Sequence, residues 1–562
     1  MLLTASACDK PATSAKALTK RESGRAREAR VTTADSAMVV SASPFATNAG
    51  LAVLRSGGNA VDAAVAVAMT LAVTYPAAGN IGGGGFMVAR INGKNVALDF
   101  RESAPKGATR DMYLDSAGNV TQKGVTGALA AGVPGSVAGL YEAHKKYGSK
   151  PWAELLKTAI TLADSGFAID TAFSDDDEGG AKRLGLDSTS AKLFLKDGKF
   201  LPVGAIWKAP GLAATLRRIA EKGRDGFYLG ETADLIVASM KAGGGIITHA
   251  DLKGFQPLWR TPVEFDYRGH HVISMPPVSS GGLTLGLILG ILEHKDLASL
   301  GWRSPQSIHV LAEAERRAFA RRNTLLGDPA FVKIPVKSFL SKDTATALAA
   351  EIGDKSSGSA PSVPAKDKRH TTHFSVVDAK GNAVAITTTI NESYGSAFSV
   401  AGAQFLLNDE MDDFTSKPGA VNAMGLVQGS TNEIAPGKRM LSSMTPTIVL
   451  DSAGAPLLVT GAAGGAYIIT AVAHQIVSVI DYHQSLGAAM AAPQFHHQDN
   501  PDSLVVEKIG WADSARVFMA PLGHGVKVSP WGFLANVQSI HRDGKVWRGV
   551  SEPRGFGLAA GY

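Results

Sequence analysis

The residues of this chain with the clearest capacity for chemistry are two threonines, Thr371 and Thr372, at the head of a strand-like segment. If the bond between His370 and Thr371 is cut, Thr371 carries both a hydroxyl nucleophile and a free α-amine. The pKa of such an amine is about 7.7–8.0, so it can accept a proton near neutral pH. One residue then supplies nucleophile and base, and no histidine is required.

The same segment also has the pattern of an ordinary β-hairpin. Residues 371–378 and 383–391 are rich in β-branched residues and are joined by a DAKGN turn, which predicts two strands whatever the function. Short motifs often match by chance. The local pattern alone therefore favours the structural interpretation, and the chemical one needs support from the rest of the chain.

Composition describes a globular chain whose body is nearly neutral. The 562 residues are 45% hydrophobic and 19% charged, which is enough to bury a large core. Residues 9–30 hold seven basic and three acidic side chains, and so contribute four of the six net positive charges. The basic excess lies in one polar tail, so a nucleic-acid partner is not indicated.

The first residues, MLLTASACDK, resemble the end of a bacterial lipoprotein signal with Cys8 at the lipidated position. Ala5 stands where such signals usually have leucine. We expect an exported protein, periplasmic or secreted, and lipidation of Cys8, a shortened ordinary export signal and a meaningless terminus remain as alternatives. Cys8 is the only cysteine, which excludes an internal disulfide. No apolar run reaches the roughly 18 residues of a membrane span.

A polar linker gives way to a strand-forming segment between residues 370 and 371. Residues 354–369 (DKSSGSAPSVPAKDKR) are expected to be exposed, mobile and easily cut. We therefore expect a disordered tail over 1–35, a large segment over 36–370 and a small segment over 371–562. Periodicity predicts a helix over 305–326 and strands over 96–101, 445–451 and 456–461.

Several blocks resemble the γ-glutamyltranspeptidases, in the order of that family. In the large segment these blocks are GGNAVDAAVAVAMTLAVTYPAAGNIGGGGFM (57–87), DFRESAP (99–105), DYRGHHVISMPPVSSGG (266–282) and LGDPAFVKIP (326–335). In the small segment they are residues 371–391, LLNDEMDDF (406–414), MLSSMTPTIVL (440–450) and TGAAGGAYIIT (460–470).

The resemblance implies an N-terminal nucleophile hydrolase, a four-layer αββα sandwich made as a precursor that cleaves itself. Thr371 would attack the carbonyl of His370 and become a new amino terminus. Its hydroxyl would then take the γ-glutamyl group from glutathione or another γ-glutamyl compound and pass it to water, an amino acid or a dipeptide. The two chains would remain together as a heterodimer, and the family needs no cofactor and no metal.

The resemblance also assigns the rest of the site. Gly464 and Gly465 would stabilise the oxyanion through backbone N–H groups at a helix start, and Thr389 would bind the amine of the nucleophile. The carboxylate of the γ-glutamyl group would be held by Arg101, Ser442 and Ser443. Its ammonium would be held by Asn391, Glu410 and Asp413. The two groups require opposite charges at opposite ends of one small pocket.

Three positions depart from the better-known bacterial members. Met424 stands where those members often have a tyrosine that bonds the equivalent of Asn391, and methionine has no hydroxyl for that bond. Ala466 and Tyr467 replace an expected Ser-Arg pair. These changes leave acceptor preference and the balance between hydrolysis and transfer open.

Two other motifs resemble a metal site and a phosphate-binding loop, but their details argue against both. His496 and His497 are adjacent and so do not share one face of a strand or helix, which disfavours a zinc site. The glycine run 82–85 has no Gly-Lys-Ser/Thr ending and is interpreted as structural. Two alternative functions remain: an N-acyl amidase of the same fold, acting on glutaryl or cephalosporin side chains, and a non-catalytic γ-glutamyl-binding relative.

Overall fold

The computed structural model describes residues 29–173, 178–358, 371–422, 425–509, 511–530 and 533–562. Predictions that concern Cys8, His370 and Met424 therefore lie outside the described residues.

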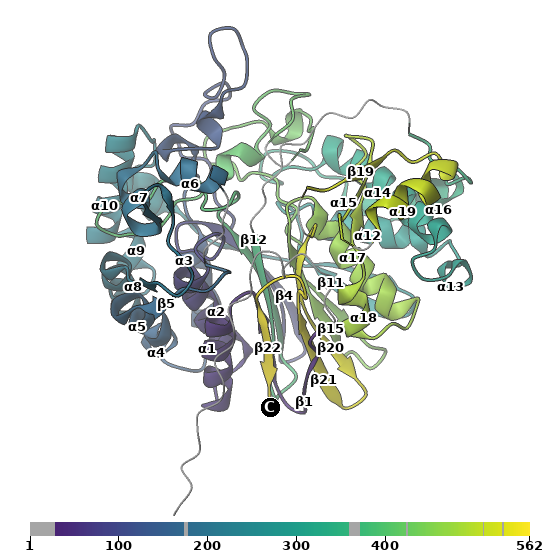
Figure 1. Ribbon diagram of the computed structural model, residues 1–562, viewed down its shortest axis with the longest axis horizontal. Helices are drawn as coiled ribbons and strands as arrows, with labels where there is room; N and C mark the ends of the chain where they lie inside the picture. The colour runs from purple at the N-terminus through teal and green to yellow at the C-terminus, as the bar shows by residue number, and fades with distance from the viewer. Residues whose placement is uncertain (1–28, 174–177, 359–370, 423–424, 510, 531–532) are drawn as a thin grey trace, which may run out of the picture.

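Two large sheets stack face to face at the centre of the molecule (Figure 1). All strand pairs within them are antiparallel. The first sheet has the order β22 (Leu558–Gly561), β2 (Met38–Ser41), β12 (Thr371–Val377), β13 (Ala383–Thr389), β3 (Gly84–Ile91), β4 (Lys94–Asp99) and β9 (Leu258–Arg260). The second has the order β1 (Thr32–Ala34), β21 (Val546–Ser551), β20 (Asn536–Asp543), β15 (Pro456–Thr460), β14 (Thr447–Leu450), β11 (His270–Ser274) and β10 (Val263–Tyr267), and β16 (Ala462–Ala463) also pairs with β20.

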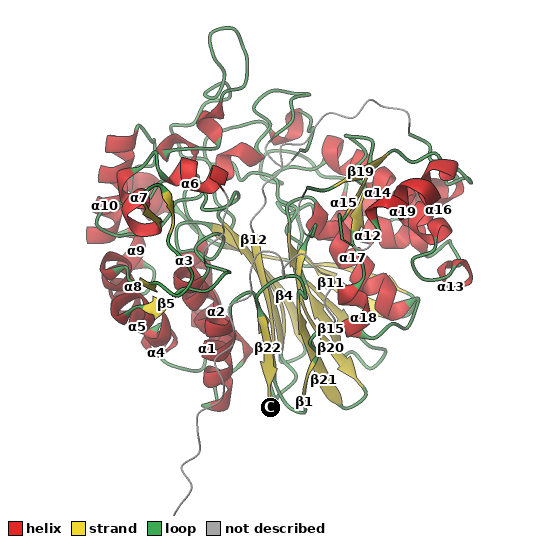
Figure 2. Cartoon of the chain, viewed as in Figure 1, coloured by secondary structure: helices red, strands yellow, loops and turns green. Residues whose placement is uncertain are grey.

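A layer of helices covers the outer face of each sheet (Figure 2). The layer beside the first sheet contains α1 (Pro44–Arg55), α2 (Ala60–Thr74), α3 (Ser136–Tyr147), α4 (Trp152–Leu155), α5 (Lys157–Ser165), α8 (Pro210–Lys222), α9 (Asp225–Tyr228) and α10 (Gly230–Gly243). The layer beside the second contains α12 (Gly281–Leu292), α14 (Pro305–Leu325), α16 (Lys342–Ala350), α17 (Tyr467–Ile480), α18 (Leu486–Ala491) and α19 (Ala512–Met519). The predicted αββα sandwich is confirmed.

The sequence of the central elements explains this layering. All seven residues of β12 and of β13 are buried, as expected for strands covered on both faces. Helix α2 is buried along its whole length and begins at a capping box between Asn59 and Asp62. One apolar cluster fills the space between the first sheet and its helices, and a second joins the two sheets to the other helix layer.

The predicted secondary structure agrees with the observed elements to within a few residues. The helix expected over 305–326 is α14, and the strands expected over 96–101, 445–451 and 456–461 are β4, β14 and β15. The exposed linker expected over 354–369 is described only as far as 358. That part is tethered, because the hydroxyls of Ser356 and Ser357 both donate to Glu313.

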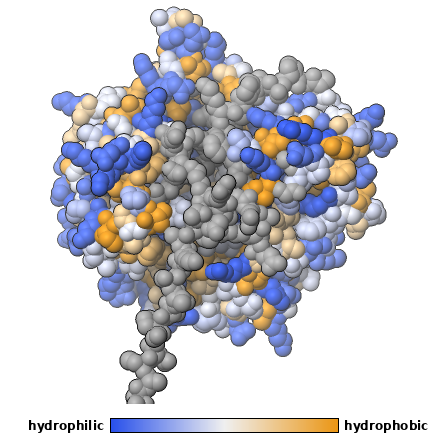
Figure 3. All heavy atoms as spheres, viewed as in Figure 1, coloured by the Kyte–Doolittle hydropathy of each residue, from blue (hydrophilic) through white to orange (hydrophobic). Residues whose placement is uncertain are grey.

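Polar and apolar side chains are interspersed on the face of the molecule shown in Figure 3. Among the described residues, no helix combines the length and the apolar character needed to cross a bilayer.

Candidate active site

The β12–β13 hairpin places Thr371 directly opposite Thr389. The two residues are partners at the open end of the hairpin, and the Thr371 hydroxyl donates to Thr389 Oγ1 across 3.3 Å. Thr389 Oγ1 also accepts the backbone N–H of Asn391 at 2.8 Å. The antiparallel register therefore brings the proposed nucleophile and its predicted partner together although 18 positions separate them in sequence.

One pocket joins nearly all the predicted site residues. It is lined by Arg101, Thr371, Thr389, Asn391, Glu410, Asp413, Ser442, Ser443 and Gly465. Gly464 precedes Gly465 in the turn but does not line the pocket. The chain segments that supply these residues are far apart in sequence, so the sandwich has to assemble before the site exists.

The predicted oxyanion glycines form the turn between β16 and α17. Gly464 and Gly465 have φ angles of +138° and +57°, values that favour glycine. A Cβ on Gly464 would also lie 2.7 Å from the carbonyl oxygen of Leu534. The turn delivers the chain to the start of α17, where backbone N–H groups and the helix dipole favour negative charge. Ala466, one of the departures noted above, is the N-cap residue and lines the pocket.

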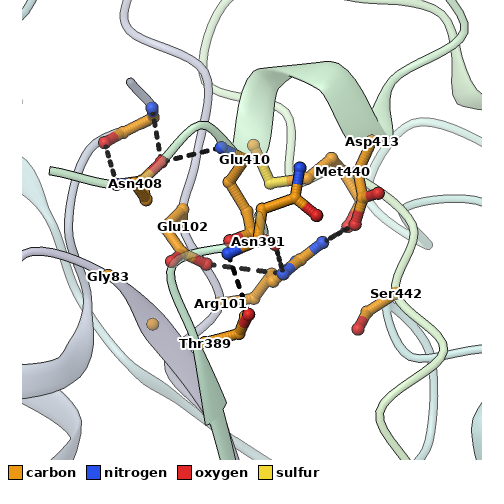
Figure 4. A network of polar contacts seen from close by, with 12 residues as sticks. Gly83, Arg101, Glu102, Thr389, Asn391, Asn408, Glu410, Asp413, Met440 and Ser442 are labelled. Carbon is orange, nitrogen blue, oxygen red and sulfur yellow. Dashed lines mark hydrogen bonds and ion pairs between the residues drawn. The ribbon is translucent and has the colours of Figure 1, made fainter. Parts of the chain in front are cut away.

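Arg101 follows β4 and is almost completely buried, at 1% exposure. Its guanidinium contacts Glu410 at 2.5 Å and also Asp413, and it donates to the carbonyl oxygen of Met440 at 3.3 Å (Figure 4). Burial lowers the pKa of Arg101, but the neighbouring carboxylates outweigh burial and raise it overall. The opposite charges are expected at opposite ends of the pocket, but Arg101 contacts Glu410 and Asp413 directly. The contact is explained by burial, because a buried guanidinium needs carboxylate partners.

Burial raises the pKa of both carboxyls that Arg101 contacts. For Glu410 and Asp413 burial is the largest cause, and the Arg101 charge opposes it. Glu410 Oε2 has no hydrogen-bond partner among the described residues. Asn391 completes this side of the pocket with a φ of +75°, and its amide donates to the carbonyl oxygen of Asp409 at 3.0 Å.

Two buried charged residues near this cluster were not predicted from the sequence. Glu102 is fully buried 3.7 Å from Arg101, and in the described part of the chain neither of its carboxyl oxygens accepts a hydrogen bond. Burial raises the pKa of Glu102 to about 7. Arg322, on α14, lines the pocket and donates to the hydroxyl of Ser443 at 3.0 Å.

A sequence signal for Arg322 exists in the spacing of α14. Ile308, Leu311, Phe319 and Arg322 are spaced three, eight and three residues apart, and all lie on the buried side of the helix. A charged residue on an apolar stripe is either paired or functional. No comparable signal marks Glu102, whose burial depends on how distant segments pack around it.

The three histidines considered from the sequence lie outside the pocket. The His496 ring contacts Thr470 Oγ1 and Gln498 Oε1, and the His497 ring contacts Asp502. His373, two residues after Thr371, is fully buried, and burial lowers its pKa to about 3, so it stays neutral. None of the three lines the pocket.

Comparison with known proteins agrees with this geometry. Residues 46–562 match the family described as Gamma-glutamyltranspeptidase. The chain belongs to the γ-glutamyltranspeptidase family. A glutathione hydrolase proenzyme of Pseudomonas sp. (strain A14) is 48% identical over 481 residues, 84% of each chain. The glutathione hydrolase proenzyme of Escherichia coli (strain K12) is 44% identical, covering 93% of this chain and 92% of its own length.

The fold also resembles the solved structure of an acylase. A crystal structure of cephalosporin acylase from Bacillus halodurans superposes with a TM-score of 0.84 at 26% identity, covering 100% of this chain and 99% of its own. This chain and the acylase therefore share one architecture, so the fold alone does not distinguish between the two functions.

Proposed function

We propose that this chain is the precursor of a γ-glutamyltranspeptidase that also acts as a glutathione hydrolase. One observation carries the proposal: the paired hydroxyls of Thr371 and Thr389 open onto a buried pocket that also holds Arg101, Glu410 and Asp413. A nucleophile beside a mixed set of charges suits an acyl group that is itself a zwitterion. The names of the relatives support the same substrate class.

Maturation and turnover use the same hydroxyl. First, Thr371 Oγ1 attacks the carbonyl carbon of His370, the C–N bond breaks and an ester forms. Water hydrolyses that ester, which leaves a carboxylate on His370 and a free α-amine on Thr371. The amine then takes the hydroxyl proton as Thr371 attacks the γ-amide carbon of the substrate. Gly464 and Gly465 are the proposed backbone donors to the oxyanion.

The second half of the cycle releases the acyl group. The departing amine takes a proton, and the γ-glutamyl group remains as an ester on Thr371. Water attacking that ester gives glutamate, and an amino acid or dipeptide gives a new γ-glutamyl amide. Either attack returns the proton and restores the free hydroxyl, so one covalent intermediate serves hydrolysis and transfer.

Substrate binding exchanges ion pairs rather than creating them. The γ-glutamyl ammonium approaches Glu410 and Asp413, and its carboxylate approaches Arg101, so the buried charges keep opposite partners throughout. Asn391, Ser442 and Ser443 supply neutral polar contacts around the same group.

The acylase alternative is supported by the likeness in fold and opposed by the pocket. A glutaryl group has a carboxylate but no ammonium, so bringing it beside Arg101 would leave Glu410 and Asp413 short of positive charge. Comparing γ-glutamyl and glutaryl anilides of equal leaving group tests this. Faster turnover of the glutaryl compound would favour the acylase.

Thr371→Ala tests the proposal itself. Without the hydroxyl, neither self-cleavage nor turnover can begin, so we expect a single full-length band on a denaturing gel and no release of aniline from γ-glutamyl anilide. The unchanged protein should give two bands, the smaller beginning Thr-Thr-His-Phe. Normal cleavage of the variant would refute the assignment, and a wild-type chain that stays intact would favour the non-catalytic binding protein.

A further inference from the structure

Arg322 occupies the pocket from the side of the second helix layer. It lies near the end of α14, is 1% exposed, and lines the same pocket as Thr371. Burying a guanidinium this deeply is costly unless its donors are used. Its hydrogen bonds therefore show what this residue holds in place.

Two of those bonds lead to the serine pair that is proposed to bind the substrate carboxylate. Arg322 Nη2 donates to Ser443 Oγ at 3.0 Å, and Arg322 Nε donates to Ser280 Oγ at 3.0 Å. The Ser280 hydroxyl in turn donates to the carbonyl oxygen of Ser442 at 2.6 Å. One side chain thus reaches Ser443 directly and Ser442 through a single relay.

These bonds also fix the direction of a proton. Arginine has donors only, so Ser443 Oγ must accept the bond from Arg322. The hydroxyl hydrogen of Ser443 then remains available for another acceptor, and Ser443 lines the pocket. A carboxylate oxygen in the pocket is an acceptor of this kind.

Arg322 and Arg101 differ in the partners of their guanidinium groups. Arg101 contacts Glu410 and Asp413. Among the described residues, the hydrogen-bond partners of Arg322 are neutral, namely Ser280, Ser443 and Asn323, and no carboxylate lies within 4.0 Å of its guanidinium. Burial lowers the pKa of Arg322 to about 10, with the Asp413 charge opposing, so the group remains a cation at neutral pH.

We propose that Arg322 is a positioning residue for the substrate carboxylate: it orients Ser443 and the Ser442 segment and supplies a positive charge that, in the described part of the chain, has no carboxylate within 4.0 Å. The inference rests on the proposed γ-glutamyl chemistry and adds a specificity determinant to it. Arg101 then binds the substrate carboxylate together with Ser442 and Ser443, and Arg322 holds these serines in place.

The test compares two substrates that differ only in the carboxylate. One is γ-glutamyl anilide, and the other is 4-aminobutyryl anilide, which keeps the amine and the scissile amide. In Arg322→Met, we expect kcat/KM for the γ-glutamyl compound to fall about 10- to 100-fold, mainly through KM, as for the loss of a charge-assisted hydrogen bond. The 4-aminobutyryl compound should change by less than about threefold, so the preference for the carboxylate collapses.

Matched variants separate positioning from folding. Arg321→Met removes the neighbouring arginine, which donates to Ser338 on another side of α14, and should keep the substrate preference. Arg322→Lys restores the charge without the fork and should recover part of the preference. If Arg322→Met does not mature into two chains, Arg322→Lys and Ser280→Ala supply the same ratio, and we expect it to fall in both.

Each result has a definite meaning. An equal loss for both anilides, or no loss for either, in a variant that matures normally overturns the role of Arg322. A wild-type protein that cleaves itself but releases no aniline from γ-glutamyl anilide contradicts the proposed function instead, and does so before any variant is made.

Discussion

At the scale of single residues, the site concentrates buried charge to an unusual degree. Arg101, Glu102 and Glu410 are each at most 1% exposed, and all three lie in one connected set of ion pairs. Burial raises the pKa of both glutamates, so their ionisation depends on Arg101. This arrangement links proton binding, stability and substrate charge at one place.

The raised pKa of Glu102 should make the stability of the fold depend on pH. Burial raises its pKa from 4.5 to about 7, so between these values the folded chain binds more protons than the unfolded chain. The stability contributed by this group is complete below about pH 4.5 and is lost as the pH rises toward 7. We expect Glu102→Gln, relative to wild type, to gain about 1 to 3 kcal/mol of stability between pH 4.5 and pH 7.

Thermal unfolding midpoints of both proteins across this pH range provide the measurement. Glu231→Gln, which removes a carboxyl that is 68% exposed, is the control and should follow wild type. A constant difference between Glu102→Gln and wild type over the whole range would show that Glu102 does not titrate there.

At the scale of elements, the glycine run 82–85, which leads into β3, sets how closely this segment approaches β13. A Cβ on Gly83 would lie 2.1 Å from the carbonyl oxygen of Thr389, and one on Gly85 would lie 2.4 Å from that of Thr387. The run therefore lets β3 and its approach press against the end of β13 that carries Thr389. Its structural role, predicted from the sequence, now has a specific purpose.

Gly83→Ala tests this close packing. The added methyl group forces either Thr389 or the glycine segment to move, and overpacking of this kind costs about 1 to 3 kcal/mol. We expect a lower unfolding midpoint together with slower self-cleavage, because the displaced strand end carries the partner of Thr371. Gly254→Ala, where a Cβ meets nothing within 4 Å, is the control. Cleavage at the normal rate in a destabilised Gly83→Ala would separate packing from positioning.

Local elements were predictable from the sequence, whereas contacts between distant segments were not. The hairpin was predictable because β-branched alternation and a DAKGN turn are local signals, and so was α17 after its two glycines. The contact between Arg101 and Glu410 was not, since 309 positions separate them and their meeting depends on both sheets. Arg322 was missed for a different reason, because the basic run around it resembles a solvated helix face until its apolar stripe is considered.

At the scale of the whole molecule, the segments on either side of the predicted cleavage site share both sheets. In the first sheet, β2 of the large segment lies between β22 and β12 of the small one. In the second, β14 pairs with β11, and β21 pairs with β1, again across the two segments. The two segments are thus interleaved parts of one fold rather than two domains.

This interleaving predicts that cleavage leaves the particle intact. Separating the chains would break strand pairing in both sheets and expose the cores on either side of them, so we expect the mature pair to elute at the same volume as uncleaved Thr371→Ala on size exclusion. Denaturant should release the two chains together with loss of the fold, in one transition. Recovery of a folded small chain alone under native conditions would contradict the shared-sheet architecture, whereas co-elution up to the unfolding transition is the expected outcome.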